Sequence, residues 1–174
     1  MNFKSLMIAV GSILLLSSAV TAQTTSYTVR RIIDGDTYEV NTKDSSGKYI
    51  QIRLSCVDAP ETSSSYKNKP GYANQSYWGS LATSKVSQLI SQSNSTIWFT
   101  PNGTSSYNRP VGDVRLSNGA SIQETLAWEG LALIDTRYIQ SCSSATQQNQ
   151  SYSQWYKKGV WNDPNFVAPW DFRK

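Results

Sequence analysis

The chain has 174 residues, a net charge of +4, two cysteines and no histidine. The absence of histidine excludes a histidine general base, a Ser-His triad and a histidine-ligated zinc ion, and two cysteines are too few for a cysteine-rich metal site. Catalysis by this chain must therefore use carboxylates, arginines, tyrosines, lysines or hydroxyls, and a metal ion should be a hard cation with oxygen ligands.

Residues 1–22 have the pattern of a secretory signal peptide: a positive charge at Lys4, an apolar run, and small residues before Gln23. The alternative is a membrane anchor, but the run is short for a span of roughly 20 apolar residues and no stop-transfer charges follow it. We expect a mature domain at residues 23–174 that is secreted or periplasmic and no longer attached to a membrane. Loss of Lys4 leaves this domain with a net charge of +3, which suits a polyanionic partner but is also ordinary for solubility.

Three strands are predicted first, at residues 27–33, 37–43 and 49–56, because β-branched and aromatic side chains dominate these runs. An Asp-Gly turn joins the first two strands into a hairpin. The other predicted elements follow in chain order: a helix at 72–92, a strand at 96–100, a loop at 101–110, a strand at 111–117, a capped helix at 121–130, a short extended piece at 131–135 and a polar helix at 143–158. This order favours a small α+β domain, a five-stranded OB-type β-barrel with three helices.

The two cysteines allow two interpretations. In an exported protein, Cys56 and Cys142 can form a disulfide. Cys56 also alternates in phase with the apolar residues of its predicted strand, so it can equally be a small buried side chain. The sequence leaves both interpretations open.

Acidic residues gather around the first and third strands. Asp34 and Asp36 flank the Asp-Gly turn, while Asp58 and Glu61 follow the third strand. Arg53 lies on that strand in the phase opposite to its apolar residues, so it points away from them. Each feature alone has an ordinary explanation, as a tight turn, a solvated loop charge or a surface arginine.

Together, these residue types suit phosphodiester hydrolysis. Carboxylates and a backbone carbonyl can hold a hard divalent cation, and a further carboxylate can take a proton from attacking water. Arginine binds phosphate oxygens with two parallel hydrogen bonds and stabilises charge that develops on them. Arg109, in the predicted loop, is the candidate for a second phosphate-binding arginine.

Five segments of the chain, in order, resemble the staphylococcal nuclease (thermonuclease-like) family. They are IIDGDTYEV, IRLSCVDAPET, YNRPVGDV, QETLAWEGLA and KKGVWNDPN. The resemblance implies an OB barrel and Ca²⁺-dependent cleavage of DNA and RNA that leaves 3′-phosphate ends. It also implies that Asp36, Asp58 and the backbone carbonyl of Ala59 are the metal ligands.

The resemblance implies that Arg53 and Arg109 bind the phosphate, that Glu61 activates water, and that Tyr107 and Tyr138 line the nucleotide pocket. Ser106 and Thr136 depart from the family, whose prototype has a lysine and a tyrosine there.

The main hypothesis is therefore an exported, Ca²⁺-dependent nuclease, monomeric, that acts on single-stranded DNA and RNA. The alternative is a non-catalytic OB-fold nucleic-acid-binding module, and a third hypothesis is a calcium-stabilised structural domain. Loss of a carboxylate or arginine from the site would favour the alternative, and none is lost in this sequence.

Overall fold

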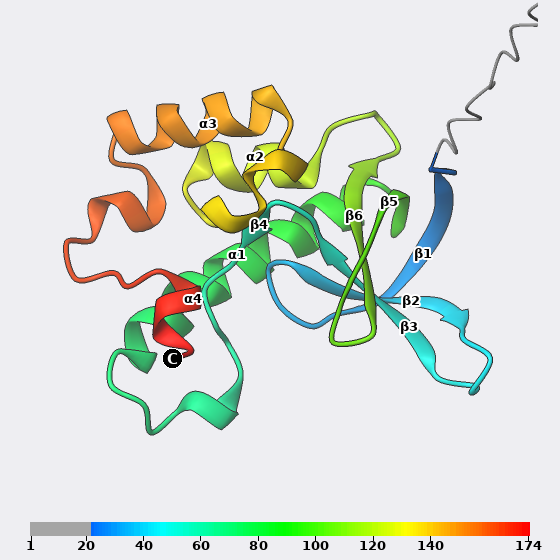
Figure 1. Ribbon diagram of the computed structural model, residues 1–174, viewed down its shortest axis with the longest axis horizontal. Coiled ribbons are helices and arrows are strands. Elements are labelled where there is room, and N and C mark those ends of the chain that lie inside the picture. The colour runs from blue at the N-terminus through cyan, green and yellow to red at the C-terminus, as the bar shows by residue number, and fades with distance from the viewer. Residues whose placement is uncertain (1–21) are drawn as a thin grey trace, which may run out of the picture.

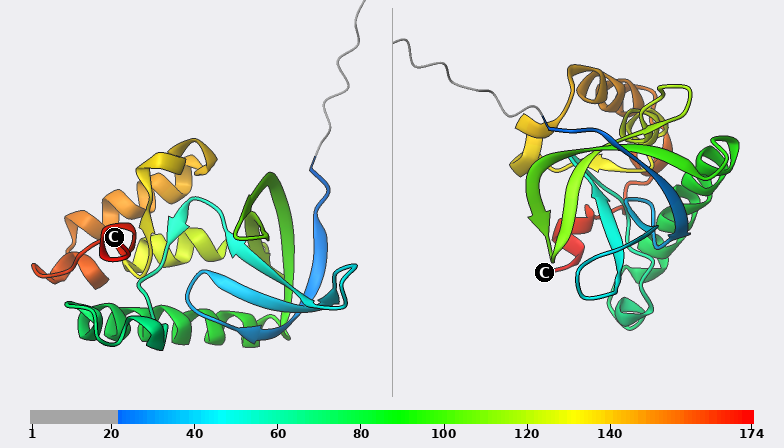
Figure 2. Two further views of the ribbon diagram at one scale, coloured as in Figure 1. Left: turned by 60° about the horizontal axis from the view of Figure 1, so that its bottom comes forward. Right: turned by 90° about the vertical axis from the view of Figure 1, so that its right-hand side faces the viewer.

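A computed structural model describes residues 22–174, and the helices gather on one side of a β-barrel (Figures 1 and 2). The signal peptide predicted at residues 1–22 lies, except for Ala22, outside the described residues. Within the part of the chain that is described, no helix is long and apolar enough to cross a membrane.

The barrel closes in the strand order β1–β2–β3–β6–β5, with β5 paired to β1. Every neighbouring pair is antiparallel except β3 and β6, which run parallel. The strands are β1 (Thr25–Ile32), β2 (Thr37–Lys43), β3 (Tyr49–Leu54), β5 (Thr96–Ser106) and β6 (Arg109–Leu116). The predicted five-stranded OB-type barrel is confirmed.

The third predicted strand, residues 49–56, is interrupted. β3 ends at Leu54, Cys56 has a φ of 73°, and the chain then enters β4 (Val57–Asp58), which pairs with β7 (Leu133–Ile134) in a separate two-stranded sheet. In a continuous strand, residues an odd number of positions apart point to opposite faces. Because the strand is interrupted, the side chains of residues 53 and 58 are no longer required to point to opposite faces.

The predicted loop at residues 101–110 is wrong, because β5 and β6 extend through it as a hairpin arm. Ser106 pairs with Arg109, and a two-residue turn of Tyr107 and Asn108 joins them, with φ values of 51° and 62°. Most residues of the arm are exposed, so its sequence lacks the alternation of apolar and polar side chains by which a strand is predicted. Arg109 is consequently the first residue of a strand and not a loop residue.

The described residues form three α-helices of eight or more residues and one single-turn α-helix. They are α1 (Tyr72–Gln92), α2 (Ile122–Glu129), α3 (Ser144–Trp155) and α4 (Pro169–Phe172). α1 buries Ala82, Val86 and Ile90 in the same core as the inner side chains of the barrel. Ser121 caps α2 through the backbone N–H of Glu124, as the capping pattern predicts.

The last long helix is shorter than predicted, and only some of its aromatic side chains pack against the rest of the protein. α3 ends at Trp155, because Lys157 adopts a φ of 50° that a helix cannot continue. Trp128 of α2 stacks on Tyr152 of α3 with ring centroids 3.7 Å apart. Trp155, in contrast, is 83% exposed and does not anchor the helix.

Candidate active site

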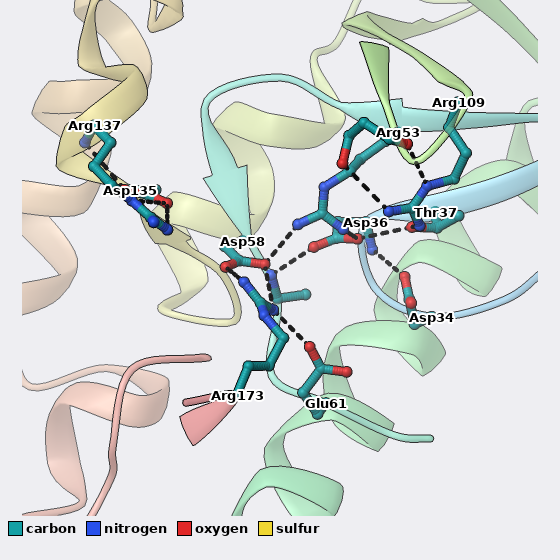
Figure 3. Close-up of polar contacts among 12 residues, drawn as sticks. Asp34, Asp36, Thr37, Arg53, Asp58, Glu61, Arg109, Asp135, Arg137 and Arg173 are labelled. Carbon is teal, nitrogen blue, oxygen red and sulfur yellow. Dashed lines mark hydrogen bonds and ion pairs between the residues drawn. The ribbon is translucent and has the colours of Figure 1, made fainter. Parts of the chain in front are cut away.

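One cavity of about 670 Å³ collects most of the residues that the sequence singles out. Its wall is formed by the end of β3, β4, the hairpin arm, the 3₁₀ segment Thr136–Ser141 and the C-terminal segment. Arg53, Asp58, Glu61, Arg109 and both predicted nucleotide-pocket tyrosines line it. Figure 3 shows the charged groups converging from these separate elements.

Asp36, directly before β2, accepts hydrogen bonds from three donors. Its Oδ1 accepts hydrogen bonds from Arg53 Nη1 at 2.6 Å and from the Thr37 hydroxyl at 2.9 Å. Its Oδ2 accepts the backbone N–H of Ala59 at 2.8 Å. The backbone N–H of Asp36 donates to Asp34 at 3.0 Å, so Asp34 shapes the turn that presents Asp36.

In an Asp-Gly hairpin turn, glycine usually serves to adopt a positive φ, but Gly35 has a different role. Its φ is not in the positive range, so the turn does not need glycine for its backbone conformation. A Cβ at this position would instead lie 2.7 Å from the Cβ of Ala82 and 2.8 Å from the Cβ of Ala59. Gly35 therefore lets the turn approach α1 and the Ala59 segment closely enough for Asp36 to reach the Ala59 N–H.

Arg53 joins the two predicted metal-binding carboxylates. Thr37 and Arg53 are paired in the β2–β3 ladder, which brings the guanidinium beside Asp36. Its other terminal nitrogen, Nη2, donates to Asp58 Oδ1 at 2.6 Å. Arg53 and Asp58 meet because the chain breaks between β3 and β4 (Figure 3).

Arg173, next to the last residue of the chain, completes this cluster and was not predicted from the sequence. It donates to Asp58 Oδ2 at 2.5 Å and to Glu61 Oε1 at 2.5 Å, and a third contact reaches Asp58 Oδ1 at 3.2 Å. The residues before it include aromatic and proline side chains that favour packing, but nothing in the local sequence indicates where this segment docks.

Arg109 reaches the same cluster from the hairpin arm. Its Nη1 donates to the Thr37 hydroxyl at 3.2 Å, and its Nε donates to the Ser106 carbonyl at 3.1 Å. Thr37 in turn donates to Asp36, so one hydroxyl links the second arginine to the first carboxylate. Both predicted phosphate-binding arginines therefore lie against the Asp36 group.

The two predicted nucleotide-pocket tyrosines are exposed at the cavity. Tyr107 is 92% exposed at the tip of the arm, and Tyr138 is 60% exposed on the 3₁₀ segment. Each ring has an arginine over it, Arg109 and Arg137 respectively, at 5.7 Å from the ring centroid. Arg137 also pairs with Asp135, which caps the 3₁₀ segment.

Burial makes the acidic cluster electrostatically costly. Burial raises the pKa of Asp36 to about 6, against the opposing effect of the Arg53 charge. Burial, and then the charge of Asp36, raise the pKa of Asp58 above its usual range. Burial also raises the pKa of Glu61, while its contact with Arg173 acts in the opposite direction.

The carboxylates of Asp36 and Asp58 are oxygen donors of the kind that hard divalent cations prefer. Asp36 and Asp58 are both buried and lie on either side of Arg53, and the charge of Asp36 raises the pKa of Asp58. Residues 22–174 contain no cluster of three or more histidine, cysteine or acidic side chains suited to a metal ion. The carboxylates of Asp36 and Asp58, which both contact Arg53, are the oxygen donors that could hold such an ion here.

Cys56 and Cys142 form a disulfide, which joins the start of β4 to the end of the 3₁₀ segment. The bond ties the strand that carries Asp58 to the segment that carries Tyr138. It thus connects two walls of the cavity.

One family model and several known nucleases match this chain. The family model described as "Staphylococcal nuclease homologue" matches residues 51–163, a range that includes Arg53, Asp58, Glu61 and Arg109 but not Asp36 or Arg173. The chain is 28% identical to "Uncharacterized endonuclease" of Escherichia coli O157:H7, over 83% of this chain and 82% of that protein. It is 25% identical to "Micrococcal nuclease" of Shigella flexneri, over 84% of this chain and 79% of that protein. It is 32% identical to "Endonuclease YncB" of Bacillus subtilis (strain 168), over 81% of this chain and 64% of that protein.

Proposed function

Because the chain belongs to the staphylococcal nuclease family and is a hydrolytic nuclease by that membership, we propose that it cleaves single-stranded DNA and RNA in a Ca²⁺-dependent reaction. We propose further that it acts as a monomer and leaves 3′-phosphate ends. The observation that carries the proposal is the Arg53 guanidinium between Asp36 and Asp58, in a cavity that Glu61 and Arg109 also line.

In this proposal, Asp36, Asp58 and the carbonyl of Ala59 hold Ca²⁺. An ion held by these groups would supply positive charge to the phosphate and lower the pKa of a nearby water molecule. Asp36 is buried to 98% of its surface and held by three donors, so its position is fixed before any ion binds. Preorganisation of this kind avoids reorganisation during the reaction.

The arginines bind the phosphate in this proposal. Arg53 uses two of its five N–H groups on carboxylates, and Arg109 reaches the Asp36 group from the hairpin arm. Two guanidinium groups on different elements can hold the non-bridging oxygens from two directions and stabilise the charge that they gain in the transition state.

Glu61 is the proposed general base. It takes a proton from the attacking water, and the resulting hydroxide adds to phosphorus while the bond from phosphorus to the 5′-oxygen breaks. The 5′-oxygen leaves with a proton from solvent, and the phosphate remains on the 3′-oxygen. The raised pKa of Glu61 suits this role, because a base is most effective when its pKa approaches the working pH.

The preference for single strands rests on the exposed rings of Tyr107 and Tyr138. An exposed aromatic ring can stack on any unpaired base, which gives affinity without reading the sequence. Arg109 and Arg137 lie against these rings and add positive charge close to where the backbone phosphates would pass.

The test is cleavage of single-stranded DNA and RNA by purified residues 23–174, with Ca²⁺ and with a chelator. We expect cleavage with Ca²⁺, a drop of at least about tenfold with chelator, and products that carry 3′-phosphates. No cleavage by the folded protein with Ca²⁺, Mg²⁺ or Mn²⁺ would contradict the proposal. Retained binding of single strands would then favour the non-catalytic OB-fold module.

We also propose that the protein is exported, to the periplasm or the medium. The signal-like pattern of residues 1–22 supports this, and so does a disulfide, since disulfides persist in oxidising compartments. Intact-mass measurement of the protein recovered outside the cytoplasm should give a chain that begins near Gln23. Recovery of the uncleaved chain from the cytoplasm alone would contradict export.

A further inference from the structure

Glu61 depends on the C-terminal segment for its side-chain position. It follows Pro60 in the loop after β4, and its backbone N–H donates to Gln75 Oε1 at 3.1 Å. Among the described residues, the polar contact recorded for its carboxylate is with Arg173. Without Arg173, the proposed base would have no charged group to fix its orientation beside Asp58.

The backbone of Arg173 is held in place by the packing of the residues just before it. Phe172, just before it, is buried and packs edge-to-face on Tyr66 with ring centroids 5.5 Å apart. The backbone N–H of Arg173 donates to the carbonyl of Pro169 at 3.0 Å within α4. These contacts fix the end of the chain beside the cavity that Arg173 lines, and Figure 3 shows the guanidinium in contact with Asp58 and Glu61.

One buried side chain fixes the Glu61 loop and the C-terminal segment relative to each other. Gln75, on α1, accepts the Glu61 N–H through its Oε1 and donates from its Nε2 to the carbonyl of Val167 at 2.6 Å. Gln75 is almost fully buried. A buried amide with both ends satisfied by backbone from two segments holds those segments in register, since breaking either bond leaves an unpaired polar group.

The charge balance also requires Arg173. Asp36, Asp58 and Glu61 face the cluster with Arg53 and Arg173 as counter-charges. Arg173 contacts both oxygens of Asp58 and one of Glu61, so a single planar group fixes the angle between the two carboxylates. Lysine has one compact ammonium group and cannot reproduce this two-carboxylate geometry in full.

We propose that Arg173 is a positioning residue for the nuclease reaction: it holds the Glu61 carboxylate in place beside Asp58, so the C-terminal segment is part of the active site. This inference rests on the proposed function of Glu61. Arg173 lies beyond the part of the chain that the family model matches, which ends at residue 163.

The test compares Arg173→Gln, Arg173→Lys and the control Lys174→Gln. Lys174 is the adjacent cation and pairs with Asp171, away from the carboxylate cluster. We expect Arg173→Gln to lower kcat on single-stranded DNA about 10- to 100-fold with KM within about threefold, because small misplacements of a catalytic group have effects of this size. Arg173→Lys should recover part of the loss, and Lys174→Gln should match the wild type.

A second readout does not depend on catalysis. In Arg173→Gln, no guanidinium offsets the repulsion between the carboxylates of Glu61 and Asp58. Replacing Glu61 by a neutral residue should therefore stabilise the folded state more in this variant than in the wild type. We expect Glu61→Gln to raise the melting temperature, without added metal, by more in the Arg173→Gln background than in the wild type. In the Lys174→Gln background, the shift should equal that in the wild type.

The outcomes separate this inference from the proposed function. Wild-type cleavage with Ca²⁺ together with a kcat of Arg173→Gln within twofold of the wild type would overturn the inference alone. Tighter Ca²⁺ binding and faster cleavage by Arg173→Gln would also overturn it, since Arg173 would then compete with the ion. A further outcome is that the wild type does not cleave while Glu61→Gln still raises the melting temperature more in the Arg173→Gln background than in the wild type. In that case the proposed function fails, and the contact between Arg173 and Glu61 stands.

Discussion

Replacing Glu61 with glutamine is expected to lower kcat for single-stranded DNA by about 10³-fold, within the range that a positioned general base contributes. Glutamine keeps the shape of the side chain and can still accept a hydrogen bond from Arg173, but it cannot take a proton from water. The arginines and the metal ligands stay in place. KM should therefore change little, because the lost interaction acts in the transition state.

The same variant should fold at least as stably as the wild type. The pKa of Glu61 is raised in the folded protein by burial, so ionised Glu61 is less favourable in the folded than in the unfolded chain. Neutral glutamine removes this cost, and the melting temperature should stay equal or rise at pH 7. As the pH falls and Glu61 takes up a proton, the difference from the wild type should shrink.

The measurements for this variant are single-turnover and steady-state kinetics, with thermal melting at pH 7 and at a pH below the usual pKa of glutamate. Glu129→Gln serves as the control. Glu129 is the last residue of α2, pairs with Lys85 of α1 and does not line the cavity. Activity of Glu61→Gln within tenfold of the control would show that Glu61 is not the base. A large drop in melting temperature would contradict the electrostatic argument.

Reducing the Cys56–Cys142 disulfide is expected to lower the free energy of unfolding by about 4 kcal/mol. The bond joins residues 86 positions apart, so it removes much of the conformational freedom of the unfolded chain. Urea unfolding with and without a reductant measures the difference.

A Cys56→Ala/Cys142→Ala double variant is the control for the reductant. Its unfolding should not respond to reductant and should resemble that of the reduced wild type. A change of less than about 1 kcal/mol on reduction of the wild type would contradict the prediction. We also expect weaker cleavage after reduction, because the bond connects the strand of Asp58 to the segment of Tyr138.

The strands and long helices follow from local patterns in the sequence, and errors occur where those patterns are absent. The hairpin arm was predicted to be a loop, because its side chains face solvent and its sequence lacks apolar alternation. A large aromatic side chain is usually buried, but Trp155 lies on the outer surface of α3. Local sequence cannot show which face of a short element remains uncovered.

The sequence determined the chemistry of this protein: the absence of histidine, the carboxylates near two strands, and the arginine between them. Only the tertiary structure decided which of these groups meet. Arg53 and Asp58 are five positions apart and would face opposite sides of a continuous strand, but the break between β3 and β4 brings them to 2.6 Å. Arg173 lies 112 positions from Glu61, and its contact depends on the packing of Phe172 and on Gln75. Such contacts follow from the burial of whole elements against one another, for which no local pattern exists.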